Sequence, residues 1–440
     1  MPQRRTIRTI VAAAAIAMTA TVGLSACADS GNGGGAGSKV VTWYINPDSG
    51  GNDPNKKGQA HLAKVCTDAS NGAYTIRTQV LPNSASDQRQ QLLRRLAAAD
   101  PNVDIMSMDP VFVAEFAQAK FLTEVPADKQ QALQEDAVQP IIDSAMWDKK
   151  MFAAPMWANT QLLWYRKSVA QAAGLDMTKP VTWDQIIEAA KSQKKTVGVQ
   201  ARRYEGYTVW INALISGAGG SVIENEGVTD VDQIKWGLET PAGKDAARII
   251  REVSDTGVGG PAMGSSDETA ALDQFLSPSS GFLLNWPYVW AALDERAPQL
   301  KSDVAWARYP QTVEGKESRP PLGGIELGVS QASTKKDLAW QAISCITSQE
   351  NQKTYMLGTG NPAARKAVYD DPQIKEMFPM AALIRESLDA GAPRPLSQYY
   401  GDISVALQRT FSPPNDVNPD TTPTAAQDLI VSVLKGEALL

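Results

Sequence analysis

Several short stretches place an amide or a carboxylate beside an aromatic residue. Trp157 stands two residues before Asn159, and Asn285 is followed directly by Trp286. Amide and carboxylate groups hydrogen-bond to several hydroxyls, whereas an indole face covers apolar C–H surface. The combination favours recognition of a sugar, although Trp286 on its own would also suit a hydrophobic core.

The same pattern recurs where other predicted strands end. Asn46 and Asp48 follow the pair Trp43-Tyr44, and Asp109 follows Met108. In open α/β sheets, ligands bind at the carboxyl ends of the strands. Taken singly, the first two residues also fit a turn, and Asp109 fits a helix cap, so the joint pattern carries the prediction.

The sequence argues against several other chemistries. The chain has 440 residues, a formal net charge of −6 and one histidine, His61, so a nucleic-acid partner, a histidine base and an imidazole metal site are disfavoured. It contains no phosphate-binding P-loop, no G-x-G-x-x-G after its first predicted strand and no G-x-S-x-G. We therefore expect no cofactor. The 48 acidic residues leave a glycosidase carboxylate pair open.

The N-terminal region predicts export. Three arginines among the first eight residues precede the apolar run Thr9–Leu24, which is too short for a comfortable membrane span. The run Leu-Ser-Ala-Cys ending at Cys27 resembles the lipobox of bacterial lipoprotein signals. We predict a signal peptide over residues 1–26, lipidation of Cys27 and a flexible tether over residues 27–38. An ordinary signal peptide cut nearby is the alternative.

Two cysteines, Cys66 and Cys345, remain after Cys27. An even pair in an exported protein favours a disulfide, and two separate buried thiols are the alternative.

Hydrophobic patterning predicts two α/β lobes that would position the polar residues. The first lobe alternates strands and helices, and the pattern then restarts after Asn159. Boxes of a threonine and a glutamine predict helix starts at Thr182 and Thr424. The main predicted elements are strands at 40–45, 73–81, 103–108, 161–165, 196–200, 281–285 and 322–330, and helices at 59–69, 87–99, 183–191, 206–215, 241–253, 267–276 and 337–350.

These features together resemble the extracellular solute-binding lipoproteins of ABC importers, in the sugar-binding group related to maltose-binding protein. The stretch PVTWDQIIEAAK at Pro180–Lys191 and the Gly323-Gly324 strand are similar to that group. The resemblance implies a two-lobed periplasmic-binding-protein-like fold with a hinge and a ligand cleft between the lobes. It further implies a monomer without enzymatic activity, anchored by lipid on the extracytoplasmic face of the cell membrane, whose partners are a sugar and an ABC permease with its cytosolic ATPase.

Longer stretches, such as SASDQRQQLLRRL and IMSMDPVFVAEFAQA, resemble the trehalose-binding lipoproteins of actinobacteria, including mycobacteria. That resemblance implies hydroxyl contacts from amides and carboxylates, a stacking indole, close approach of a glycine backbone and an arginine that closes the site. It also implies a Cys66–Cys345 disulfide, and it places Glu326 where an amide is expected. The implied ligand-binding residues are Asp48, Gln88, Asp109, Asn159, Glu268, Trp286, Gly323, Gly324 and Arg394.

The resemblance also implies the path of the chain between the lobes. Lobe 1 comprises residues 39–157 and 320–360, and lobe 2 comprises residues 158–319 and 361–440. A binding protein for maltodextrin, a glycerophosphodiester or a peptide is one alternative function, and an exported glycosidase is another.

Overall fold

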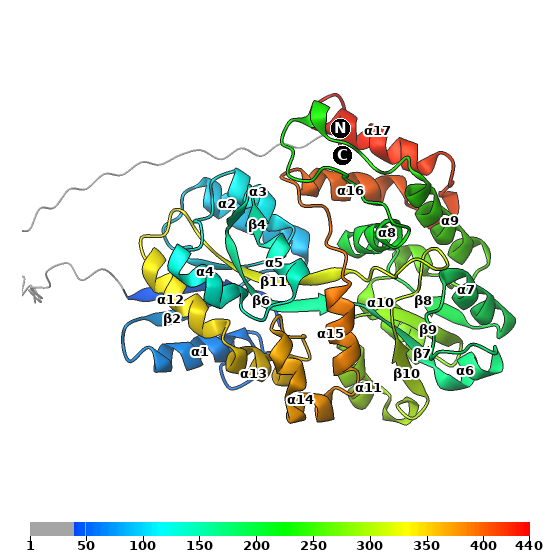
Figure 1. Ribbon diagram of the computed structural model, residues 1–440, viewed down its shortest axis with the longest axis horizontal. Helices are drawn as coiled ribbons and strands as arrows, with labels where there is room; N and C mark the ends of the chain where they lie inside the picture. Colours follow the sequence, from blue (N-terminus) through cyan, green and yellow to red (C-terminus); the bar gives the residue numbers. More distant parts are fainter. Residues whose placement is uncertain (1–38, 49) are drawn as a thin grey trace, which may run out of the picture. The chain divides into compact units, whose positions relative to one another are not determined.

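The computed structural model describes residues 39–48 and 50–440, which form a mixed α/β structure around two main sheets (Figure 1). The first sheet has the strand order β2-β1-β3-β11-β6, and the second has the order β10-β7-β9-β8. The predicted α/β class is therefore confirmed. The predicted signal peptide, Cys27 and the tether lie outside the described residues.

The strands are β1 (Val40–Ile45), β2 (Thr75–Val80), β3 (Ile105–Met108), β4 (Met146–Trp147), β5 (Lys150–Met151), β6 (Ala153–Thr160), β7 (Leu162–Arg166), β8 (Thr196–Gly198), β9 (Ser280–Asn285), β10 (Val304–Ala307) and β11 (Leu322–Val329). The helices are α1 (Gln59–Ala69), α2 (Ala85–Ala97), α3 (Phe112–Gln118), α4 (Ala127–Gln134), α5 (Gln139–Ser144), α6 (Lys167–Ala172), α7 (Trp183–Ser192), α8 (Glu205–Gly217), α9 (Pro241–Asp255), α10 (Glu268–Leu276), α11 (Val289–Arg296), α12 (Lys336–Ile346), α13 (Gln349–Thr359), α14 (Pro372–Met377), α15 (Ala381–Asp389), α16 (Tyr400–Thr410) and α17 (Thr422–Leu434).

The first sheet is parallel on one side and antiparallel on the other. Strand β1 runs parallel to β2 and β3, whereas β11 runs antiparallel to both β3 and β6. Its apolar strands pack into a core with the helices that flank them, and Trp43, Leu92 and Trp340 are among the fully buried side chains. Because β1 and β3 are parallel, the residues that follow them lie at one edge of the sheet.

The second sheet begins almost as soon as the first one ends. Strand β6 ends at Thr160 and β7 starts at Leu162, then pairs antiparallel with β9 and β10. The Trp164 indole is fully buried, and its Nε1 donates to the Asn285 carbonyl at 3.0 Å. This bond ties β7 to the end of β9, directly before Trp286.

A disulfide joins two distant parts of the first core. Cys66 in α1 and Cys345 in α12 are bonded, with their Cα atoms 5.8 Å apart. Figure 1 shows α12 beside α1, although 279 positions separate the two cysteines. The predicted disulfide is confirmed.

One predicted helix start is correct and the other is wrong. Thr182 accepts from the Gln185 backbone N–H, and the Gln185 side chain accepts from the Thr182 N–H, which completes a capping box. Helix α17 instead starts at Thr422, so Thr424 lies inside the helix. The proline at position 423 occupies the first turn, where its missing N–H costs no helical hydrogen bond.

Candidate functional site

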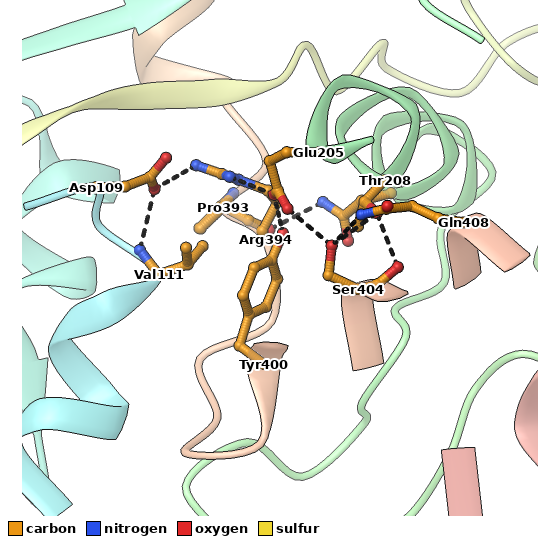
Figure 2. A network of polar contacts seen from close by, with 10 residues as sticks. Asp109, Val111, Glu205, Thr208, Pro393, Arg394, Tyr400, Ser404 and Gln408 are labelled. Carbon is orange, nitrogen blue, oxygen red and sulfur yellow. Dashed lines mark hydrogen bonds and ion pairs between the residues drawn. The ribbon is translucent and has the colours of Figure 1, made fainter. Parts of the chain in front are cut away.

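Asp109 and Arg394, two of the predicted ligand residues, form an ion pair (Figure 2). Asp109 follows β3, and its Oδ1 accepts from Arg394 Nη2 at 2.6 Å and from the Val111 N–H at 3.2 Å. Arg394 Nη1 donates to Glu205 Oε1, also at 2.6 Å. The Arg394 side chain is only 5% exposed. Burial alone would lower the pKa of Arg394, but Asp109, Tyr400 and Glu205 outweigh it and raise that pKa, so the cation is maintained.

Asn159, Gly323 and Trp286 lie together at the junction of the two sheets. Asn159 pairs with Gly323 across β6 and β11. A Cβ atom on Gly323 would lie 3.3 Å from the Trp286 ring and 3.8 Å from the Asn159 Cβ. The glycine therefore gives the indole room to approach the strand. Asn159 Oδ1 accepts from the Thr160 N–H at 3.0 Å, and its Nδ2 forms no hydrogen bond within the described residues.

Glu268 starts α10 and is connected to the same junction. Its backbone carbonyl accepts from Asn285 Nδ2 at 2.9 Å and from the Tyr288 hydroxyl at 3.1 Å. Its side chain accepts from the Tyr204 hydroxyl. Burial first, and the neighbouring Glu268 second, raise the pKa of Tyr204, so this phenol stays protonated and acts as a donor. The Tyr204 hydroxyl thus orients the Glu268 carboxylate.

Gln88 and Asp48 belong to a separate polar cluster at the edge of the first sheet. Gln88 Nε2 donates to the Pro82 carbonyl at 2.9 Å, and its Oε1 accepts from Asn46 Nδ2 at 2.9 Å. Asp48 Oδ2 accepts from the Gln59 N–H at 2.7 Å. Asp48 Oδ1 accepts from two glycine N–H groups of the following turn, at 2.9 and 3.0 Å. Both oxygens of Asp48 therefore organise its loop and the start of α1.

Gly324 and Glu326 make close contacts within the first sheet and its flanking helix. Gly324 has a φ of +132°, and a Cβ atom there would lie 2.3 Å from the Trp157 carbonyl oxygen. Glu326 is fully buried, and its Oε1 accepts from Ser144 Oγ at 2.7 Å. Burial, together with the nearby charge of Asp109, raises the pKa of the Glu326 carboxyl well above its ordinary range.

Six of the nine predicted residues therefore fall into two neighbouring groups, Asp109 with Arg394, and Asn159, Gly323 and Trp286 with Glu268. Trp286 directly follows Asn285, whose side chain contacts the Glu268 carbonyl. Leu322 directly precedes Gly323 and lines a small hollow together with Arg394.

A larger hollow of about 700 Å³ lies beside this set, between the end of α8 and the segment around Lys316 and Arg319. It includes Pro393, the neighbour of Arg394, but none of the nine predicted residues lines it.

Sequence reasoning missed Tyr204, Glu205 and Tyr400. The first two follow the end of β8, so the rule that polar residues after strands face a ligand could have found them. Tyr400 begins α16 and comes from a part of the chain without a strand, where that rule gives no signal.

Among residues 39–48 and 50–440, no group of three or more histidine, cysteine or acidic side chains could hold a metal ion. Within the same ranges, no helix is long and apolar enough to cross a membrane.

Residues 64–353 match the family described as bacterial extracellular solute-binding protein. A curated relative from Deinococcus radiodurans, named a probable ABC transporter-binding protein, is 23% identical over 376 residues, which cover 81% of this chain and 84% of the relative.

Solved structures share the fold at low sequence identity. A maltose-bound T. maritima protein, MalE3, superposes with a TM-score of 0.74 at 24% identity, covering 91% of this chain and all of that one. A cyclic α-maltosyl-1,6-maltose binding protein from Arthrobacter globiformis gives a TM-score of 0.70 at 20% identity, again covering 91% of this chain and all of the other. These likenesses confirm the predicted two-lobed fold.

Proposed function

The chain belongs to the family of bacterial extracellular solute-binding proteins, and we propose that it captures a disaccharide, trehalose, for an ABC importer. The observation that carries this proposal is the junction of Trp286, Gly323 and Asn159, with the Glu268 backbone connected to it through Asn285 and the Glu268 carboxylate bonded to Tyr204. An indole face, an amide and an oriented carboxylate provide the two kinds of contact that a sugar requires. The structural neighbours named above for maltose and a cyclic maltosyl-maltose support the choice of a sugar.

The proposed mechanism is closure of two lobes around the ligand. Lobe 1 comprises residues 39–157 and 320–360, and lobe 2 comprises residues 158–319 and 361–440. The lobes would rotate where the chain crosses between the sheets, beside Asn159. Closure removes water, and each buried hydroxyl without a partner then costs about 1–3 kcal/mol. A disaccharide with a different linkage would leave such groups unpaired, which is the basis of specificity.

In this proposal Asp109 and Arg394 take part in closure as well as in binding. Asp109 follows a strand of the first sheet, whereas Arg394 is bonded to Glu205 at the start of α8. Their ion pair therefore connects the two lobes. Sugar hydroxyls can replace part of this contact, because carboxylates accept and guanidinium groups donate several hydrogen bonds.

The protein would be anchored through a lipid on Cys27, would act on the extracytoplasmic face of the membrane as a monomer, and would deliver its ligand to permease subunits powered by a cytosolic ATPase. It would bind its ligand without chemical conversion. The proposed ligand set also includes Gln88, Asp48 and Gly324. In the structure these three residues contact other parts of the protein.

Isothermal calorimetry with trehalose, maltose, a glycerophosphodiester and a peptide tests the proposal. We expect trehalose to bind most tightly. Asn159→Ala and Asp109→Ala should each weaken that binding at least tenfold while the protein stays folded. Asn102→Ala, which removes an exposed amide away from the site, is the control and should bind normally. Tighter binding of another solute would overturn the trehalose assignment, and unchanged binding in both site variants would overturn the site. Release of glucose from trehalose would instead indicate a glycosidase.

A further inference from the structure

Two polar stripes inside the second lobe converge on Arg394 (Figure 2). Glu205, Thr208 and Asn212 lie three and four positions apart on α8, so they share one face of the helix. Tyr400 and Ser404 lie four apart on α16 and share a face in the same way. Most of α8 is apolar and buried, so its polar stripe needs partners inside the protein.

Glu205 is the centre of this arrangement. Its Oε1 accepts from Arg394 Nη1 at 2.6 Å and from the Tyr400 hydroxyl, and its Oε2 accepts from Ser404 Oγ at 2.7 Å. The Glu205 side chain is 18% exposed. Three donors from two segments fix both of its oxygens, so the carboxylate has little freedom to rotate.

The remaining members of the stripes fix the neighbouring backbone. Asn212 Nδ2 donates to the Pro393 carbonyl at 3.0 Å, directly before Arg394. Thr208 Oγ1 lies 2.8 Å from Ser404 Oγ, and Gln408 Nε2 donates to the same Ser404 oxygen at 2.9 Å. The polar residues of α8 and α16 therefore hold both the backbone next to Arg394 and the Arg394 guanidinium.

The aromatic ring of Tyr400 also lies near the Arg394 guanidinium. The guanidinium carbon lies 5.8 Å from the centre of the Tyr400 ring. Burial first, and then Glu205, raise the pKa of the Tyr400 hydroxyl, so it stays protonated and donates to Glu205.

We propose that Glu205 is a positioning residue that holds Arg394 in its ligand-binding orientation, independently of Asp109. The two carboxylates that accept hydrogen bonds from Arg394 belong to different parts of the fold. Glu205 lies in α8, whereas Asp109 follows β3 of the first sheet. If the lobes separate, the bond to Asp109 breaks and the bond to Glu205 remains. Arg394 is then already oriented when a ligand arrives, which reduces the entropy lost on binding. This inference rests on the proposed function, in which Arg394 contacts the ligand.

The first experiment needs no ligand. The coupling between Asp109 and Arg394 is measured by urea unfolding of Asp109→Asn, Arg394→Gln and the double variant, once in the native background and once with Glu205→Gln. We expect Glu205→Gln to reduce this coupling at least fivefold, expressed as a ratio of unfolding equilibrium constants. A coupling that is unchanged in the Glu205→Gln background would overturn the positioning role, whichever solute the protein binds.

The second experiment measures trehalose affinity by calorimetry. Glu205→Gln should weaken binding about tenfold in the native background and should have no further effect once Arg394→Gln is present. Equal losses in both backgrounds would show that Glu205 acts without Arg394, and would overturn the inference. Glu205→Asp keeps the charge and should recover part of the affinity. Glu252→Gln removes the carboxylate of a different arginine pair, with Arg248 in α9, and should leave affinity unchanged.

The two experiments separate the inference from the function on which it rests. If trehalose does not bind at all, the proposed function fails, and the unfolding cycle still decides whether Glu205 positions Arg394. If trehalose binds but the cycle shows no loss of coupling, the function stands and the positioning role is wrong.

Discussion

The buried carboxyl of Glu326 should make the stability of the protein fall as the pH rises. Its side chain is fully buried in β11, with Ser144 as the hydrogen-bond partner of Oε1, and its Oε2 has no partner among the described residues. Burial and the charge of Asp109 raise its pKa in the folded protein well above the value of 4.5 expected for an unperturbed glutamate. The folded state therefore binds a proton that the unfolded state releases.

The sign and size of the effect follow from linkage. A carboxyl with a raised folded pKa contributes its full stability below the unfolded pKa, and that contribution is lost as the pH rises through the folded pKa. Between the two pKa values the loss is about 1.4 kcal/mol for each pH unit. Glu326→Gln removes the titration but keeps the shape. Between pH 4.5 and the folded pKa, the unfolding free energy of the variant relative to the native protein should thus increase by about 1.4 kcal/mol per pH unit.

Urea unfolding at one-unit intervals from pH 5 to pH 8 measures this slope for both proteins. The slope is the test, because any constant packing difference between glutamate and glutamine cancels from it. Glu314→Gln, which changes an exposed acid between β10 and β11, should show no such slope. A difference between Glu326→Gln and the native protein that stays constant over this range would refute the reasoning.

Four further outcomes can be measured, three from the geometry and one from the predicted lipidation of Cys27. Gly323→Ala should weaken trehalose binding in calorimetry with little loss of stability, because its Cβ would displace the Trp286 ring. Gly324→Ala should instead lower the unfolding free energy by roughly 1–3 kcal/mol, because its φ of +132° suits only glycine. Cys66→Ser should lower the free energy of unfolding, measured in urea, by roughly 2–5 kcal/mol, because the disulfide closes a loop of 279 residues. Cys27→Ala should release the protein from the membrane fraction into the medium, as detected by immunoblotting, and continued membrane association would contradict lipid anchoring.

Local patterning predicted most of the fold because its signals are short-range. The apolar run at Val40–Ile45 is a buried strand, and the box at Thr182 caps α7. A similar box at Thr424 failed because α17 already begins at Thr422, with Pro423 in its first turn, so Thr424 is not the N-cap. A threonine and a glutamine at the right spacing therefore fit the interior of a helix as well as its start, and only the preceding residues distinguish the two cases.

The candidate site was harder to predict, because residues that are adjacent in the sequence can make quite different contacts in the folded protein. Gly323 and Gly324 look equivalent in the sequence. In the structure the first leaves room for the Trp286 ring, and the second meets the backbone of β6. Asp48 likewise follows a strand, as Asp109 does, yet its oxygens accept from its own loop and from the start of α1. Which partner each group finds depends on packing between segments that are far apart in the chain.

The arrangement around Arg394 shows why this matters for function. An arginine held by one carboxylate could follow either lobe when the lobes move. Arg394 has two, and Glu205 is itself fixed by Tyr400 and Ser404, whereas the Asp109 carboxylate accepts only one other hydrogen bond among the described residues, from the N–H of Val111. The bond to Asp109 is therefore the weaker constraint and the one that motion between the lobes would break. A ligand that offers hydroxyls to Asp109 would compete for that contact alone, leaving the cation in place to donate to the ligand.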